Sequence, residues 1–147
     1  MISKPHATET MNYEFGNVTY TPPSTYYLRL STTAITFDTG TGFTEPTSVG
    51  YNAVSITNDA SNWEVNENGY ITNKNTVEFP AFNATASGTN ITHWFISKDS
   101  SGGTALYYDV LRDGSGDPVV FPVISGGKVI VPAGYIQLGR ANEPYSG

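Results

Sequence analysis

The segment Asp113-Gly114-Ser115-Gly116-Asp117 places two carboxylates in a glycine-rich loop. Carboxylate oxygens in such loops are typical Ca²⁺ ligands. The spacing is not that of an EF-hand, however, and no glutamate follows where a bidentate ligand would be needed. A surface turn closed by aspartate side chains explains the same residues. We therefore interpret this loop as a turn, and expect the protein to use no metal ion or other cofactor.

A second acidic motif, Asp38-Thr39-Gly40, has the sequence of the catalytic loop of aspartic proteases, in which two carboxylates share one proton. The later Ile136 to Arg140 is similar to the apolar-glycine segment that packs under that loop in retroviral proteases. A chain with one motif would need a symmetric dimer to supply the second aspartate. Because the motif runs into the polar Thr41-Gly42 and three residues match easily by accident, we interpret Asp38 as a turn residue.

The two histidines, His6 and His93, lie far apart in the sequence. His93 interrupts an apolar strand-like run. Neither histidine has a nearby Ser/Asp pair or a second metal ligand in the sequence. A packed or interface histidine is the simpler interpretation of His93, and we expect no enzymatic activity.

Several aromatic residues could stack on sugars, because amphipathic rings bind with little loss of conformational entropy. They are Trp63, Trp94 and the adjacent Tyr107 and Tyr108. Alternate residues of a strand point to opposite faces. At least one of Trp63 and Trp94, and one of Tyr107 and Tyr108, should therefore be buried in the core. Trp63, Tyr107 and Tyr108 are therefore candidate contact residues, for a glycan or for a neighbouring protein.

The composition excludes several other classes of partner. The net charge is −6 and only seven residues are Lys or Arg, so no basic patch is expected to bind nucleic acid. The chain has no Cys, which removes disulfides and thiolate chemistry. No apolar run approaches the length of a membrane span, and the first residues do not resemble a signal peptide. The sequons at Asn17, Asn83 and Asn90 are interpreted as chance.

The elements that must position these residues are mainly strands. The run Thr25 to Ser31 alternates, with Tyr26, Leu28 and Leu30 on one face. Similar alternation occurs at residues 51–57, 76–82, 91–98 and 105–111, and further strand-like runs occur at 119–124, 128–131 and 134–138. Glycine- and asparagine-rich turns separate the runs. Seven or eight short strands predict a single all-β domain, an antiparallel β-sandwich or jelly-roll-like fold, with a core that includes Leu28, Leu30, Val54, Ile56, Trp94 and Ile96.

Only 8–15 could be helical, with Thr8 as the N-cap and Gly16 as the stop. We accordingly predict an N-terminal arm with a short helix at 1–20, a β-sandwich at 21–140 and a C-terminal tail at 141–147. The arm has no alternation of its own, so its order is expected to come from a partner. Its candidate contact residues are Met1, Ile2, Lys4 and His6.

Several segments, read in order, resemble a family of short tailed-bacteriophage tail fibre proteins. They are Pro23 to Ala34, Gly40 to Pro46 followed by Gly50-Tyr51, Val77 to Ala81, Ile91 to Ile96 with Ser101 to Gly103 and Leu106 to Tyr108, and Pro132 to Leu138. The resemblance covers roughly residues 12 to 138 and depends on the order of several modest motifs.

This resemblance implies a non-enzymatic structural protein of the virion, in contact with other capsid or tail proteins. Two roles remain open. In the first, which we favour, the protein is a capsid decoration or head-fibre protein held by its N-terminal arm, and it forms a homotrimer. In the second, it is a tail-fibre or receptor-binding module whose loops meet a glycan or protein of the host surface. An aspartic-type protease is a distant third.

Overall fold

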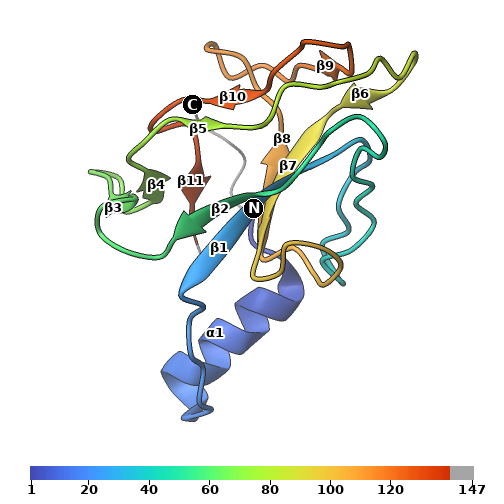
Figure 1. The fold of residues 1–147 in the computed structure, drawn as a ribbon. Helices are drawn as coiled ribbons and strands as arrows, with labels where there is room; N and C mark the ends of the chain where they lie inside the picture. The colour runs from blue at the N-terminus through green and yellow to red at the C-terminus, as the bar shows by residue number, and fades with distance from the viewer. Residues whose placement is uncertain (140–147) are drawn as a thin grey trace.

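The computed structural model describes residues 1–139, which form one N-terminal helix and a set of short antiparallel strands (Figure 1). In chain order these are α1 (Lys4–Gly16), β1 (Thr25–Ser31), β2 (Val54–Thr57), β3 (Trp63–Val65), β4 (Ile71–Asn73), β5 (Val77–Glu78), β6 (Asn90–Ile91), β7 (His93–Ser97), β8 (Tyr107–Val110), β9 (Phe121–Pro122), β10 (Ile130–Val131) and β11 (Gln137–Leu138). The prediction of an all-β fold with one short N-terminal helix is confirmed.

The largest sheet has the strand order β2-β1-β7-β8, with every pair antiparallel. Leu28 of β1 faces Ile96 of β7, and Leu30 faces Trp94. Side chains that are opposite each other in such a pair share one face of the sheet. The period-two pattern of β1 and β7 therefore places these four apolar residues together on the core side.

The core lies between this sheet and three short ladders: β10-β5, β11-β4-β3 and β6-β9. These ladders stand where a sandwich would have a second continuous sheet. Of the six residues predicted to be buried, Leu28, Leu30, Ile56, Trp94 and Ile96 are buried. Val54, at the first position of the edge strand β2, is only half-buried.

The β3–β4 hairpin was not predicted, although its turn, Asn66 to Gly69, is one of the glycine- and asparagine-rich turns expected between the runs. Asn66 closes that turn by accepting hydrogen bonds from the backbone N–H groups of Asn68, Gly69 and Tyr70. Gly69 supplies the positive φ of 81° that the turn needs. Each strand of the hairpin is three residues long, which is too short for an alternating pattern to be recognised.

Helix α1 begins four residues earlier than predicted. Ser3 occupies the N-cap position in place of Thr8, and Pro5 lies in the first turn. Proline is favoured there because its φ suits a helix and its missing N–H would have had no helical partner. The helix ends near the predicted stop, but Asn17 rather than Gly16 takes the left-handed conformation, with φ 56°.

The first three residues form part of the domain and do not stand apart as an arm. Ile2 forms an isolated antiparallel bridge with Tyr107 of β8. The Met1 α-amino group donates to the Tyr108 carbonyl at 2.7 Å, and the Ser3 N–H donates to the Leu106 carbonyl at 2.9 Å. The expectation that a partner orders this segment is therefore wrong for Met1 to Ser3, because the edge of the protein's own sheet supplies the hydrogen bonds.

Candidate interaction surfaces

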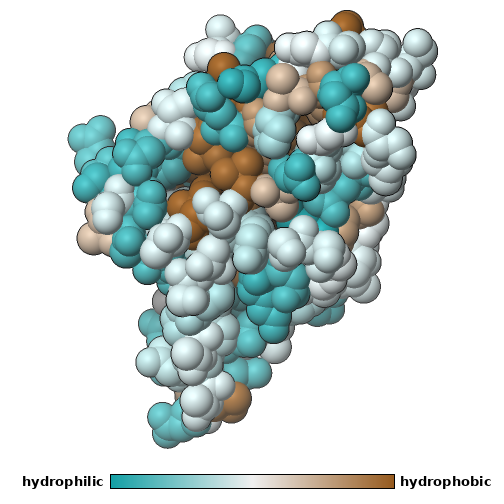
Figure 2. All heavy atoms as spheres, viewed as in Figure 1, coloured by the Kyte–Doolittle hydropathy of each residue, from teal (hydrophilic) through white to brown (hydrophobic). Residues whose placement is uncertain are grey.

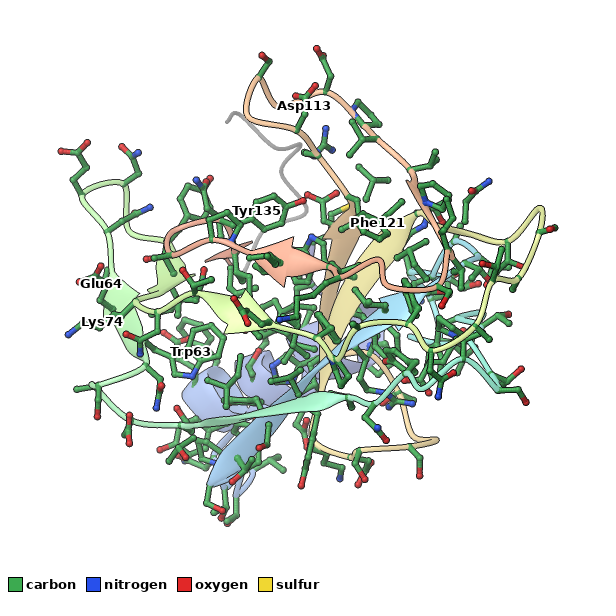
Figure 3. All side chains as sticks on the ribbon, turned by 45° about the horizontal axis from the view of Figure 1, so that its top comes forward. Trp63, Glu64, Lys74, Asp113, Phe121 and Tyr135 are labelled. Atoms are coloured by element: carbon green, nitrogen blue, oxygen red, sulfur yellow. The ribbon has the colours of Figure 1, made fainter. Side chains whose placement is uncertain are left out.

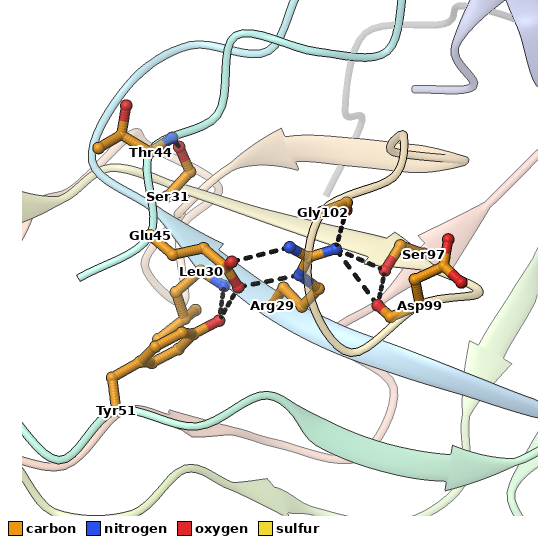
Figure 4. A network of polar contacts seen from close by, with 9 residues as sticks. All are labelled: Arg29, Leu30, Ser31, Thr44, Glu45, Tyr51, Ser97, Asp99 and Gly102. Atoms are coloured by element: carbon orange, nitrogen blue, oxygen red, sulfur yellow. Dashed lines mark hydrogen bonds and ion pairs between the residues drawn. The ribbon is translucent and has the colours of Figure 1, made fainter. Parts of the chain in front are cut away.

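Arg29 is the centre of a buried polar network on the face of the main sheet opposite the core (Figure 4). Its side chain is 0% exposed. The guanidinium binds the Glu45 carboxylate through two hydrogen bonds, Nε to Oε1 at 2.9 Å and Nη2 to Oε2 at 2.7 Å. Nη1 donates to Ser97 Oγ at 3.0 Å and to the Gly102 carbonyl at 2.7 Å. A bidentate, charge-assisted pair of this kind fixes both side chains.

Two further interactions complete the network. The Tyr51 hydroxyl donates to Glu45 Oε1 at 2.7 Å and accepts from the Leu30 N–H at 3.0 Å. Burial is the main cause that raises the pKa of Tyr51, so the hydroxyl keeps its proton. Arg29 Cζ also lies 4.7 Å from the ring centroid of Phe95 and 5.0 Å from that of Phe43, within range of cation–π attraction.

The network joins the segments through which the sequence resembles a fibre family. Arg29 comes from the first strand, Glu45 from the Gly40 to Pro46 segment, Tyr51 from Gly50-Tyr51 and Gly102 from the glycine pair that follows β7. The period-two pattern placed Arg29 on a polar face and gave no sign of burial. The sequence did contain a sign of this burial, because Arg29 lies between the apolar strand residues Leu28 and Leu30. If loops cover such an arginine, it needs an acidic partner such as Glu45.

The two acidic motifs form turns. In the first, the backbone of Thr36 pairs with that of Thr41, and the exposed Asp38 carboxylate lies 3.4 Å from Lys4 Nζ. In the second, Asp113 Oδ1 accepts from the backbone N–H groups of Ser115 and Asp117 at 2.9 and 3.0 Å. Within residues 1–139 no three His, Asp or Glu side chains are grouped so that they could hold a metal ion.

The two histidines lie in separate places. His6 is 3% exposed and packs edge-on against Tyr107. Its Nδ1 lies 3.5 Å from Glu9 Oε2 and makes no hydrogen bond to the described residues. His93 is half-buried, and its Nδ1 lies 2.7 Å from Thr92 Oγ1. Burial is the main cause that lowers the pKa of both histidines; Glu9 opposes the shift at His6 and Asp109 at His93.

Some of the aromatic candidates are buried and others are partly buried, as the alternation of strand residues between two faces predicts. Trp94 and Tyr108 are buried, whereas Trp63 and Tyr107 are only partly buried. Trp63 and Tyr107 line one cavity of about 170 Å³, together with Tyr26, whose ring packs edge-on against Trp63. Burial raises the pKa of Tyr107 to about 12. The structure thus brings two of the candidate contact residues together and places Tyr108 elsewhere.

The N-terminal candidates fall into two groups. Ile2 and His6 are buried within the chain, so they are not available to a partner. Met1 and Lys4 are exposed. Sequence reasoning missed a larger exposed surface, which is formed by the second half of α1 and the residues after it. Every residue from Met11 to Thr19 is exposed, and Phe15 is 76% exposed. Figure 1 shows α1 projecting from the β-rich body.

Two hollows lie on the body. Figure 2 shows brown, apolar atoms in a hollow near the middle of the face in view, where a cavity of about 250 Å³ lies between β2 and β5. A second cleft of about 320 Å³ lies between residues 111–121 and 129–135. Figure 3 shows Tyr135 and Phe121 on two sides of this cleft, with Asp113 on the loop above.

Comparison with known proteins gives one family. The family model described as "Podophage GP4 fiber I protein gp80" matches residues 1–138. No curated protein matches the chain. In the described part of the chain, residues 1–139, no helix is long and apolar enough to span a bilayer.

Proposed function

The chain belongs to the family of the podophage GP4 fiber I protein gp80, a family of virion proteins; from this premise we propose that it is a non-enzymatic structural module of the phage fibre. The observation that carries the proposal is the extent of the family match, which takes in α1 and every described strand. The family description favours the fibre over the capsid-decoration role that we favoured from the sequence.

The geometry supports a structural role. The Arg29 side chain is buried and its charge is neutralised by Glu45, while Nη1 donates to the Ser97 hydroxyl and to the carbonyls of Asp99 and Gly102. Such a network stabilises one arrangement of the loops. Asp38, the strongest catalytic candidate from the sequence, is exposed and contacts a lysine. A catalytic aspartate dyad instead needs two carboxyl groups in contact.

We further propose that the partners are other virion structural proteins and that the protein is a homotrimer. A second candidate role, contact with a host glycan, is favoured by the cavity between Trp63, Tyr26 and Tyr107, which offers three aromatic rings over an apolar floor. Rings of this kind stack on the apolar faces of sugars.

The test is the location of the protein in intact particles. Antibodies against the purified chain, imaged on whole virions by electron microscopy, are expected to label the fibres. Preimmune antibodies are the control. Labelling spread evenly over the capsid would instead support the decoration role and would overturn the fibre proposal.

A further inference from the structure

A polar hollow adjoins the cavity that Trp63, Tyr26 and Tyr107 line. Its volume is about 560 Å³, and it is bounded by the start of α1, by the segment that leads into β1 and by the loop between β7 and β8. Figure 1 shows α1 and the segment before β1 running alongside each other. We call this space the polar hollow, and we call the cavity of about 170 Å³ at Trp63 the aromatic cavity.

Ring contacts make the two spaces neighbours. His6, which lines the polar hollow, packs against Tyr107 of the aromatic cavity with ring centroids 5.0 Å apart. Tyr20 also lines the polar hollow, and its ring centroid lies 6.0 Å from that of His6. Burial, and then the neighbouring Tyr20, raise the pKa of Tyr26 in the aromatic cavity. A ligand that extends past these rings can therefore occupy both spaces.

The polar hollow offers hydrogen-bonding groups of both kinds. Lys98 lines it and is the one lysine or arginine in residues 1–139 whose charged group contacts no acceptor in that range. Three exposed threonines, Thr19, Thr21 and Thr104, also line it, and their hydroxyls make no hydrogen bond to another described residue. Glu9 adds a carboxylate. An ammonium group only donates, a carboxylate only accepts and a hydroxyl does both, so this set suits a ligand rich in hydroxyl groups.

A buried ring nitrogen without a partner belongs to each space. Trp63 Nε1 and His6 Nδ1 are buried, and neither has a hydrogen-bond partner in the described part of the chain. Trp63 lines the aromatic cavity, and His6, which is only 3% exposed, lines the polar hollow. Buried polar atoms in native proteins are nearly always paired, so an unpaired one calls for a partner outside the chain. A hydroxyl group can accept from the Trp63 N–H and can pair with either tautomer of His6.

We propose that the two spaces together bind a neutral oligosaccharide. One sugar ring stacks by its apolar face in the aromatic cavity, and the adjacent sugar binds through its hydroxyls in the polar hollow. A wholly apolar ligand would leave Lys98 and Glu9 without water or partners. An acidic glycan is disfavoured because Glu9 lines the hollow and the chain carries a net charge of −6. This inference rests on the host-glycan role proposed above, and it adds the class of glycan and a second binding space.

The test uses the full chain and oligosaccharides from the surface polysaccharide of a bacterium that the phage infects. Anion exchange divides them into a neutral and an acidic pool, and a saturation-transfer NMR titration measures binding of each. Wild type is expected to bind the neutral pool and not the acidic one. Equal or stronger binding of the acidic pool, or binding of neither, overturns the proposal.

Two substitutions test the two spaces separately. Trp63→Leu keeps an apolar side chain but removes the ring, and should weaken binding by about fivefold or more. Lys98→Ala removes a donor from the polar hollow and should weaken binding by about three- to tenfold. The matched controls are Phe15→Leu and Lys128→Ala, which change an exposed aromatic residue and an exposed lysine outside both spaces. Both controls should bind as wild type does.

The pattern among the variants decides the outcome. If Trp63→Leu weakens binding and Lys98→Ala does not, the sugar occupies the aromatic cavity alone and the two-space proposal is wrong. If the controls weaken binding as much as the test variants do, the contact is non-specific and the proposal is also wrong. The urea midpoint of each variant checks that it is folded.

Failure of this inference and failure of the fibre proposal are distinguishable. A wild-type protein that binds no sugar would leave the antibody labelling of fibres unchanged. Labelling of the capsid would overturn the fibre proposal and would leave the NMR titrations unaffected.

Discussion

At the scale of single residues, the bidentate contact between Arg29 and Glu45 differs from the single contact between Lys4 and Asp38 both in its geometry and in its surroundings. The first has a fully buried cation and an acid that is 21% exposed, at 2.7 Å. The second joins side chains that are 61% and 70% exposed, at 3.4 Å. Exposed pairs are screened by water, whereas a buried charge that loses its partner is strongly destabilising.

Glu45→Ala is therefore expected to lower the free energy of unfolding by about 3 kcal/mol, because it leaves the Arg29 guanidinium buried without its carboxylate. It also removes the acceptor of the Tyr51 hydroxyl. Asp38→Ala is the matched control and should change stability by less than about 0.5 kcal/mol. Urea unfolding of both variants measures the difference. Equal losses would show that the buried network contributes no more than a surface pair.

The histidines predict how stability depends on pH. Burial holds the pKa of His6 and His93 below the usual 6.5 in the folded protein. Above about pH 6.5 both states are neutral, so these groups do not affect stability. Below it, the unfolded chain binds protons that the folded chain does not, so stability falls until the lower folded pKa values are reached.

Unfolding measured at about pH 7 and about pH 5.5, above the range where most carboxylates titrate, should show this loss. His6→Gln combined with His93→Gln should reduce it. A stability that rises as the pH falls over this interval would contradict the assigned direction.

At the scale of elements, the first three residues serve as an additional edge segment of the main sheet. Ile2 is 1% exposed and bridges to β8. Ile2→Ala is expected to cost about 2 kcal/mol or more, as for other large aliphatic residues truncated in a core. Met11→Ala, on the exposed side of α1, should change stability by less than about 0.5 kcal/mol. Thermal unfolding of the two variants tests the contrast, and equal shifts would show that the segment is not part of the folded core.

The strands that could be predicted from sequence are those long enough to alternate. Leu28 and Leu30 in β1, and Trp94 and Ile96 in β7, fall at period two and are buried. Alternation says which residues share a face, but not whether loops cover the opposite face. Arg29, on that opposite face, was therefore not recognised as buried.

Other features depend on contacts between segments that are distant in the sequence. Ile2 meets β8 more than 100 residues later, and no local pattern in the first residues predicts that bridge. The same limit applies to the candidate surface. The sequence singled out Trp63 and Tyr107, which line one cavity, but the exposure of Phe15 became visible only when the position of α1 relative to the body was known.

At the scale of the whole molecule, the main sheet and the ladders share one core. One large cluster contains buried residues of β1, β7, β10 and β11, and Trp63 of β3 packs against it. Phe95 of β7 and Tyr108 of β8 belong to a second, smaller cluster that shares the same strands. The domain is therefore expected to unfold in one cooperative transition.

Tryptophan fluorescence can test this, because Trp94 reports on the main sheet and Trp63 on the β3–β4 hairpin. Trp63→Phe and Trp94→Phe each leave one reporter. In each variant the fluorescence midpoint in urea should coincide with the midpoint from far-ultraviolet circular dichroism. Two separate midpoints within one variant would show that the hairpin unfolds independently.

The strand order β2-β1-β7-β8 also determines the sequence of events during synthesis. β1 ends at Ser31, but one of its two partners, β7, begins only at His93. The first residues, Met1 to Ser3, can pair only after β8 has been synthesised, which is later still. At typical ribosomal rates of about 5–20 residues per second, the first strand waits roughly 3 to 12 s for β7. The nascent chain consequently exposes Leu28 and Leu30 to the cytosol for seconds, so the risk of aggregation is greatest before translation reaches the second half of the chain.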